Sequence, residues 1–313
     1  MPTLLIASIV IFAIMRVVPG DVALVVLGGS GESTHDVEQL ERLRDELGLD
    51  DPLIQQYGDW VLSMVNGDFG GDSLESREPI ASIVGRQFPV TLLLTGYAVM
   101  LAVGFSIPLG VLSARRQDRW IDYLVRALSI AGQAAPTFVL ALLVLLGLVV
   151  LIGWSPPIIY ADPWDDFLQH ARMLILPTIV LAIGLSAALV RITRAAVLEV
   201  QGQDFVRTAR SKGLAEGVVL TRHTLRVALI PVLTVSSIQV GALLSGAVVL
   251  ESIFGLPGIG RGIVQAVTSR DYPVIQALGL LIVFLVLAIN LLTDVLYVFI
   301  DRRISFGDST ARP

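Results

Sequence analysis

The sequence predicts an all-α integral membrane protein with six transmembrane helices and both termini on the cytoplasmic side. Three observations carry this prediction. Hydrophobic residues make up 54% of the 313 residues and charged residues only 16%, against about 25% charged residues in soluble domains. Apolar runs long enough to cross a bilayer recur along the chain. The basic residues gather between alternate runs, as they do in cytoplasmic loops.

The first apolar run, residues 2–18, is at the short end of what a membrane span requires, which is about 17–25 residues. No basic segment precedes it and no small-x-small cleavage site follows it. We therefore expect a helix that stays in the protein rather than a signal peptide.

The segment 21–89 is polar and acidic, and it is too long and too charged to lie in hydrocarbon. It is expected to form a helical loop on the extracytoplasmic side. Apolar residues on one side of 33–47 predict an amphipathic helix there. A second helix is expected to start with Asp51 as its N-cap and Pro52 at its first position, and to end at Gly67.

The later apolar runs each approach the length that crosses about 30 Å of hydrocarbon. The longest of them is interrupted by Gly132, Gln133 and Pro136. The five further crossings predicted in this way are 91–114, 123–154, 173–190, 232–250 and 277–300.

Charge sets the direction of the crossings. The segments 114–126, 191–228 and 301–313 hold four, seven and three of the 22 basic residues. The short loops on the opposite side hold three arginines, Arg172, Arg261 and Arg270. Basic residues mark the cytoplasmic side, so both termini are expected there, and residues 1–313 are expected to form a single transmembrane domain.

The segment 204–231 is the most basic part of the chain between two apolar runs, so it must face water. Helix-forming residues extend to Lys212, Gly213 interrupts them, and a second helical stretch runs from Leu214 toward Pro231. The sequence therefore predicts a helix, a bend and a helix. The alternative is an ordinary basic cytoplasmic loop, which is common in proteins with several spans.

This segment resembles the EAA loop of ABC importer permeases, with Ala209 and Gly213 at the second alanine and the glycine of the motif and Pro231 as its closing proline. Arg207 replaces the glutamate, and the stretch from Gly213 to Pro231 is longer than in sugar permeases. Both departures are the pattern of the dipeptide, oligopeptide and nickel permeases. Those loops read aromatic-V-R-T-A-x-x-K-G and then R-H-x-L-R-x-A-L-I-P, as residues 205–213 and 222–231 do here.

The resemblance covers nearly the whole chain. It includes R-x-x-P-G-D at 16–21, E-S-I-F-x-x-P-G-I-G-R at 251–261 and R-D-Y-P-V at 270–274. It implies the type I ABC importer permease fold and a multi-pass subunit of the bacterial or archaeal cytoplasmic (inner) membrane. The implied partners are a second homologous permease subunit, two ABC ATPase subunits, an extracytoplasmic substrate-binding protein and membrane lipid, with no nucleic acid.

In this family the loop 204–231 carries a short helix, here about 210–217, that fits a groove on the ATPase. The residues to which the resemblance assigns this coupling role are Arg207, Ala209, Arg210, Lys212, Gly213, Leu214, Glu216 and Gly217. A phosphate-binding P-loop requires Gly-x-x-x-x-Gly-Lys-Ser/Thr, but Gly213 follows the only lysine, Lys212. We therefore expect no catalytic residue, cofactor or metal in this chain, and ATP and Mg²⁺ on the partner ATPases.

Two further groups of residues are candidates. Glycine and proline are dense in 251–261, so this segment is expected to break the helix and form an outer gate or a receptor contact; a plain surface loop is the alternative. The residues concerned are Glu251, Pro257, Gly258, Gly260 and Arg261. Polar residues on the membrane segments are candidates to line a passage, or else to join helices by hydrogen bonds: Ser129, Gln133, Gln239, Ser245 and Asn290.

Two other classes of function are considered. An ion-coupled secondary transporter needs ionisable groups near the bilayer centre, and Asp294, one turn after Asn290, is a weak candidate. An intramembrane enzyme fits less well, because His35, His170 and His223 lie in separate loops and the usual hydrolase motifs are missing. Dipeptides or oligopeptides are the first expectation for the substrate, with nickel or glutathione as alternatives.

Overall fold

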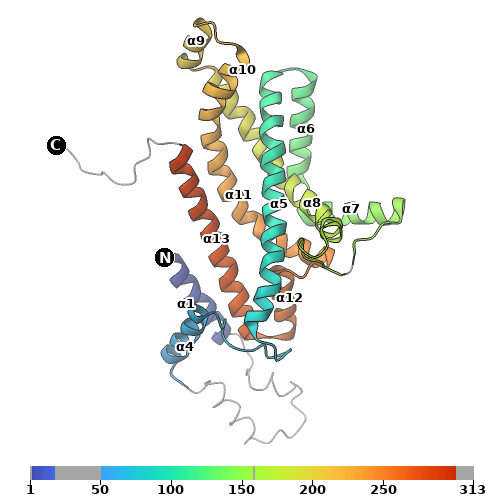
Figure 1. Ribbon diagram of the computed structural model, residues 1–313, viewed down its shortest axis with the longest axis vertical. Helices are drawn as coiled ribbons and strands as arrows, with labels where there is room; N and C mark the ends of the chain where they lie inside the picture. The colour runs from blue at the N-terminus through green and yellow to red at the C-terminus, as the bar shows by residue number, and fades with distance from the viewer. Residues whose placement is uncertain (1, 18–50, 158, 301–313) are drawn as a thin grey trace, which may run out of the picture. The chain divides into compact units, whose positions relative to one another are not determined.

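The computed structural model describes residues 2–17, 51–157 and 159–300, which form helices joined by turns and one isolated β-bridge between Asp72 and Pro79 (Figure 1). The helix predicted at 33–47 lies outside the described residues. The helices are α1 (Pro2–Val17), α4 (Leu53–Asn66), α5 (Ile80–Arg115), α6 (Trp120–Ala134), α7 (Thr137–Ile152), α8 (Phe167–Gln201), α9 (Asp204–Ser211), α10 (Glu216–Val218), α11 (Leu225–Phe254), α12 (Ile259–Ser269) and α13 (Tyr272–Ile300).

Four helical segments are long and apolar enough to cross a membrane, and they confirm four of the predicted crossings. These segments are Ile80–Arg115, Phe167–Gln201, Glu216–Phe254 and Tyr272–Leu292. The helix α1 is apolar but has only 16 residues, or about 24 Å at 1.5 Å per residue, which is less than the hydrocarbon thickness. Within the described residues the protein is therefore an all-helical membrane protein with four candidate spans, or five if the bent pair α6 and α7 is one span.

The predicted crossing 123–154 is not one straight helix. Helices α6 and α7 meet at Ala135 and Pro136 with a bend of 101°, and α7 turns sideways from α6 in Figure 1. The break follows from Pro136, which has no N–H to donate to the carbonyl of Gly132 and whose ring excludes a continued helix. The predicted interruption at Gly132, Gln133 and Pro136 is therefore confirmed, and α6 and α7 together form a broken span or a re-entrant loop.

Three helix boundaries differ from the prediction. Helix α5 begins at Ile80, within the segment expected to be a loop, because Ile80, Ile83 and Val84 find apolar partners on α12 and α13. The helix continues through Pro89, where one backbone hydrogen bond is missing because proline has no N–H.

Helix α4 has Pro52, not Asp51, at its N-cap, because the Pro52 carbonyl accepts the first helical hydrogen bonds. Helix α8 begins at Phe167, before the crossing predicted for 173–190. The Asp166 side chain caps α8 by accepting a hydrogen bond from the N–H of Gln169 at 2.9 Å.

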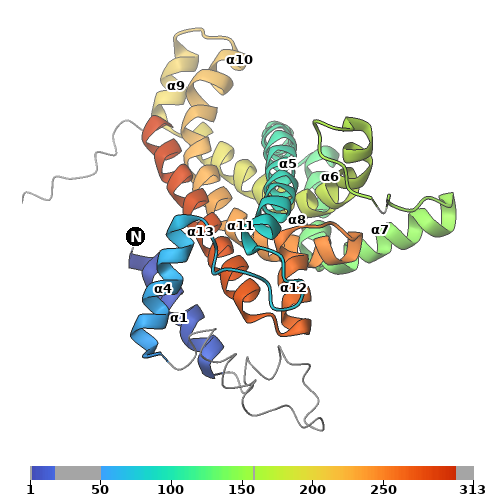
Figure 2. The same ribbon diagram turned by 60° about the horizontal axis from the view of Figure 1, so that its bottom comes forward.

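The described residues fall into two compact units. The first combines residues up to Thr91 with residues 255–285. In it α1 and α4 lie side by side (Figure 2), with the ring of Phe12 5.4 Å from that of Tyr57 and the Ser8 hydroxyl 2.8 Å from the Tyr57 hydroxyl. Its apolar core joins the first turns of α5 to α12 and α13. Ahead of α5, hydrogen bonds from Arg86 and Ser82 lower the pKa of Glu78 to about 2.

The second unit combines residues 92–254 with the residues from Val286 onward. Helix α8 is its central helix: seventeen of its residues are buried, and it packs against α6, α7 and α11. A smaller apolar cluster lies at one end, where residues of α5, α8, α9 and α11 meet. This cluster fixes the segment after α8 onto the helices that precede it.

Helices α5 and α8 approach so closely at Gly110 that no side chain fits. A Cβ at Gly110 would lie 2.6 Å from the Cβ of Thr193 and 2.9 Å from the carbonyl oxygen of Val190. We expect Gly110→Ala to push the helices apart and to lower the stability of the purified protein by about 1–3 kcal/mol, the usual cost of overpacking. Thermal unfolding in detergent measures this.

The matched control for this substitution is Gly104→Ala on the same helix, where a Cβ meets nothing within 4 Å. It is expected to unfold at the wild-type temperature or slightly above, because alanine is the better helix former. Equal unfolding temperatures for both variants would contradict the close approach.

Candidate functional site

The loop predicted to bind a partner is anchored by one face of α9. Val206 and Ala209 are buried there, and they belong to the cluster that contains Val197 and Val200 of α8 and Val219 beyond the bend. The other residues of the helix are exposed. An eight-residue helix is too short to be stable alone, so this packing is what holds α9 in place.

The bend after α9 is a Schellman turn with Gly213 in the left-handed conformation, φ +78°. The N–H of Gly213 donates to the carbonyl of Arg210 at 2.9 Å, and the N–H of Leu214 donates to the carbonyl of Ala209 at 3.4 Å. Glycine is favoured at this position because a side chain at such a φ is strained. The sequence prediction of a helix, a bend at Gly213 and a second helix is confirmed.

The exposed side of the bend combines cationic and apolar groups. Arg207 and Lys212 are exposed, and Arg210 is paired across the bend with Glu216, its Nε donating to Oε1 at 2.8 Å. Exposed apolar side chains lie among them, namely Phe205, Leu214 and Val218. An exposed ion pair adds little stability, so this surface is better suited to contact with another protein than to holding the loop together.

The range 210–217, expected to be one short helix, is not one. It holds the end of α9, the turn at Gly213 and the start of α10. From Glu216 the chain continues as helix without a gap, through a π-helical turn at Val219–Thr224, into α11. Gly217 lies in this continuous helix, and a Cβ there meets nothing within 4 Å.

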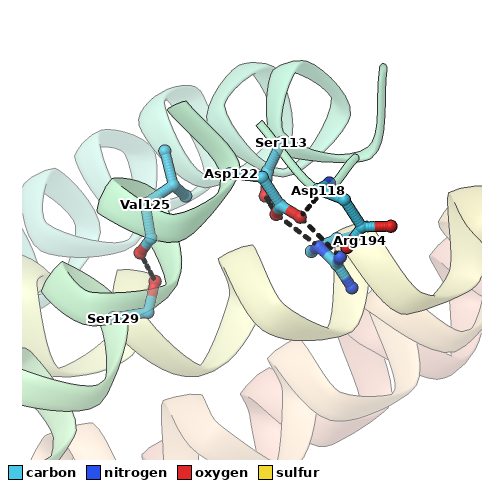
Figure 3. A network of polar contacts seen from close by, with 6 residues as sticks. All are labelled: Ser113, Asp118, Asp122, Val125, Ser129 and Arg194. Atoms are coloured by element: carbon cyan, nitrogen blue, oxygen red, sulfur yellow. Dashed lines mark hydrogen bonds and ion pairs between the residues drawn. The ribbon is translucent and has the colours of Figure 1, made fainter. Parts of the chain in front are cut away.

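A buried ion pair lies near this loop, and the sequence analysis missed it (Figure 3). The Asp122 carboxylate of α6 is fully buried and accepts two hydrogen bonds of 2.7 Å from Arg194 of α8, from Nε and Nη2. The Ser113 hydroxyl of α5 donates to it at 2.5 Å, and the N–H of Asp118 at 3.1 Å. Charged, bidentate pairs of this kind are strong and directional, so the pair ties α5, α6 and α8 together.

One signal could have revealed the ion pair. Asp122 is an acidic residue next to an apolar run, and an ionisable residue in or near a membrane segment requires a partner. The sequence does not say which of the neighbouring arginines that partner is. Only the packing of α6 on α8 selects Arg194.

A polar hollow of about 280 Å³ lies where the α6/α7 bend meets α8 and α11. Gln133 and Thr137 reach it from the bend, and Gln239 reaches it from α11. Arg191 of α8 donates a hydrogen bond from Nη1 to Oε1 of Gln133. The structure thus brings together two of the five residues predicted to line a passage.

The other three predicted lining residues lie elsewhere. The Ser129 hydroxyl is buried and donates to the carbonyl of Val125 on its own helix at 2.8 Å (Figure 3), which fits the alternative of a structural hydrogen bond. Ser245 and Asn290 are exposed and do not line the hollow. The side chain of Asp294, the weak candidate for ion coupling, is outside the described side chains.

The segment predicted as an outer gate breaks the helix as expected. Gly255 ends α11 with φ +70°, and Gly258 is the N-cap of α12. Gly258 and Gly260 are buried and Pro257 is half-buried, so this part of the chain is not a plain surface loop.

Two polar side chains hold this segment within its unit. The N–H of Ile259 donates to the Thr91 hydroxyl at 2.9 Å, and Arg261 donates from Nη1 to the carbonyl of Gly255 at 2.6 Å. Glu251, the first residue of the predicted group, belongs to the other unit and is fully buried near the end of α11. The predicted group is therefore divided between two units.

Two family models match the chain. Residues 106–306 match the model described as binding-protein-dependent transport system inner membrane component. Residues 1–95 match the model of the N-terminal part of such a membrane component.

Curated relatives match over nearly the full length. A protein of Brucella suis biovar 1 (strain 1330), whose name describes a peptide transport system permease protein, is 41% identical over 305 residues, which cover 97% of this chain and 96% of that protein. The glutathione transport system permease protein GsiC of Escherichia coli (strain K12) is 38% identical over 305 residues, 97% of this chain and 95% of that protein.

Two solved structures share the fold at 20% identity. An inward-facing form of the MetNI methionine ABC transporter superposes with a TM-score of 0.58, covering 72% of this chain and 99% of that chain. An amino acid ABC transporter with histidines superposes with a TM-score of 0.52, covering 71% of this chain and 94% of that chain.

Proposed function

We propose that this chain forms one half of the passage of an ATP-driven peptide importer. The premise is that the chain belongs to the family of binding-protein-dependent transport system inner membrane components. Membership of the family makes it a multi-pass, non-catalytic membrane subunit without a cofactor, in a bacterial system that also has a binding protein and an ATPase. The ion-coupled and enzymatic alternatives are thereby set aside.

The observation that carries the peptide assignment is the similarity over 305 residues to permeases named for peptide and for glutathione transport. Glutathione is itself a tripeptide, so both names describe substrates with amide bonds and terminal charges. A polar hollow in a subunit that is otherwise apolar supports the same assignment. Glutathione and nickel remain distinct outcomes of the experiment below.

We further propose the six-crossing type I topology with cytoplasmic termini. In this arrangement α1 and the bent pair α6/α7 supply the two crossings beyond the four long helices, and segment 21–89 lies on the extracytoplasmic side. The basic residues of 191–228 support a cytoplasmic position for the bend at Gly213, on the side of the ATPase. The buried segment 255–261 lies on the outer side and is proposed as the gate.

The hollow at the α6/α7 bend is open toward the surface of this chain, since Gln133 is exposed. A passage that is closed on all sides therefore requires a second subunit. We propose a homologous but non-identical permease in that place, with two ATPases below. Purifying the tagged full-length chain from its natural host and identifying the co-purified subunits tests this. An active transporter that holds this chain as its only membrane subunit would refute it.

Uptake into vesicles that contain the purified complex tests the substrate. With the binding protein outside and ATP at the ATPase side, we expect labelled di- to pentapeptides to accumulate, and we expect no accumulation without ATP. Uptake of glutathione alone or of nickel alone would replace the peptide assignment with the corresponding alternative. Uptake driven by a proton gradient without ATP would contradict the proposed function as a whole.

A further inference from the structure

We propose that the polar hollow at the α6/α7 bend binds the main-chain amide groups of a peptide in transit. This inference rests on the proposed function and adds to it a site and a mode of recognition. The hollow lies near the middle of α8 and α11, and the residues that define it are Gln133, Pro136, Thr137, Gly184 and Gln239.

The orientation of Gln133 is the first argument. Arg191 donates to its Oε1, and a guanidinium group has only donors, so the carbonyl end of the Gln133 amide is the end that faces Arg191. The NH₂ end, with two N–H donors, is then available to the hollow. A donor held in this way fits the carbonyl oxygen of a peptide bond.

The broken helix is the second argument. Pro136 has no N–H, so the carbonyl of Gly132 cannot receive its normal helical hydrogen bond. Thr137 begins α7, and the first N–H groups of a helix have no acceptor within that helix. Irregular backbone at membrane depth is tolerated where it lines a polar cavity. Gly132 and Thr137 both line this one, so the groups left without a helical partner belong to residues at its wall.

The rest of the lining is the third argument. Gln239 lines the hollow from α11. The rest of the lining consists of small residues such as Ala135, Gly184 and Gly246, together with Pro136, Thr137 and three leucines, Leu181, Leu185 and Leu243. The described residues that line the hollow include none with a charge. Amides and small residues can hold a peptide backbone while leaving space for different side chains. They do not fit nickel, which binds imidazole, thiolate or carboxylate groups.

The experiment compares Gln133→Leu and Gln239→Leu in the reconstituted full complex. Each variant keeps roughly the volume of the side chain and removes one amide group. Gln133→Leu also removes the acceptor of the Arg191 hydrogen bond, so Gln239→Leu is the cleaner of the two tests. At a peptide concentration below saturation we expect uptake to fall by about three- to tenfold, the ratio that corresponds to one lost hydrogen bond. The amount of assembled complex is measured alongside, and the fall is expected in uptake per assembled complex. The control is Ser245→Ala, which lies on the same helix as Gln239 but outside the hollow, and which should transport as the wild type does.

A second measurement does not depend on how the leucine variants assemble. The chain has no cysteine, so Ala242→Cys, in the lining of the hollow, is the only thiol that a water-soluble reagent can label in this subunit. The subunits are separated before the label on this chain is measured. We expect peptide supplied during turnover to slow this labelling at least about threefold, and to leave labelling of Ser245→Cys unchanged.

The two failures are distinguishable. If the wild-type complex takes up no peptide, the proposed function is wrong. If it takes up peptide while both leucine variants transport normally, or if peptide does not protect Ala242→Cys, the site is wrong and the proposed function stands.

Discussion

Replacing Gly213 with valine is expected to abolish uptake while the amount of protein in the membrane stays near that of the wild type. The glycine forms the C-terminal turn of α9 at φ +78°. A residue with a Cβ pays about 1–2 kcal/mol in that conformation, and a β-branched residue more. A shift of 1.4 kcal/mol already changes the ratio of two turn conformations tenfold.

The substitution is expected to impair the coupling of ATP hydrolysis to transport, and not the folding of this chain. A Cβ at Gly213 meets nothing within 4 Å in this chain, so the side chain itself fits and only the backbone is strained. The altered turn would displace Leu214 and the Arg210–Glu216 pair on the exposed side of the bend. Uptake and receptor-stimulated ATP hydrolysis should fall together, and co-purification of the ATPase should fall with them if docking is lost.

Two variants separate backbone strain from contact with the partner. Gly213→Asn should retain a substantial part of the activity, because asparagine tolerates the left-handed conformation better than valine does. Gly217→Ala adds a Cβ in open space at an ordinary helical φ and should be close to wild type. Strong loss in Gly217→Ala would mean instead that the ATPase approaches the loop closely. Wild-type uptake by Gly213→Val would show that this loop is not the coupling element.

Replacing Arg194 with leucine is expected to destabilise the protein by about 3–5 kcal/mol, because it leaves the buried Asp122 carboxylate without its charged partner. The hydrogen bonds from Ser113 and Asp118 remain but do not neutralise the charge. The unfolding temperature of the purified complex and the amount of assembled complex in membranes are the measurements. Replacing Asp122 and Arg194 together with leucine should recover most of the loss, since no buried charge is then left.

Arg126→Leu is the control for the Arg194 variant. Arg126 lies on α6 four residues after Asp122, is exposed and contacts the ring of Tyr123 at 5.7 Å. Its removal should cost less than about 1 kcal/mol. An Arg194→Leu variant as stable as the Arg126→Leu variant would mean that the ion pair is not a structural tie between α6 and α8.

The predictable parts of the fold are those that depend on local sequence, without contacts between distant residues. Long apolar runs identify spans because hydrocarbon accepts little else, and Pro136 and Gly213 break helices through their own covalent structure. The start of α5 at Ile80 was missed because it depends on α12 and α13, which cover Ile83 and Val84. Composition gives no information on such a tertiary contact.

The candidate sites divide in the same way. The bend at Gly213 was predictable because the glycine, the helix before it and the charges around it are local features. The pair Asp122–Arg194 joins residues 72 positions apart, and the surroundings of either residue do not identify the other. Of the polar residues on the spans, Gln133 and Gln239 meet at the hollow only because α7 bends away from α6. Ser245 and Asn290 are also polar residues on membrane segments, but they do not line the hollow.

The first compact unit also has a consequence for how the protein is made. Its core joins Ile80, Ile83 and Val84 to residues of α12 and α13, and Val84 and Ile259 are 175 positions apart. At about 5–20 residues per second, a ribosome needs roughly 10–35 s to deliver the second half of this core after the first. During that time the apolar side of the first turns of α5 has no partner from its own chain and has to be shielded by lipid or by the insertion machinery. A chain that ends before α12 would therefore contain the whole loop 204–231 and still lack the core of this unit.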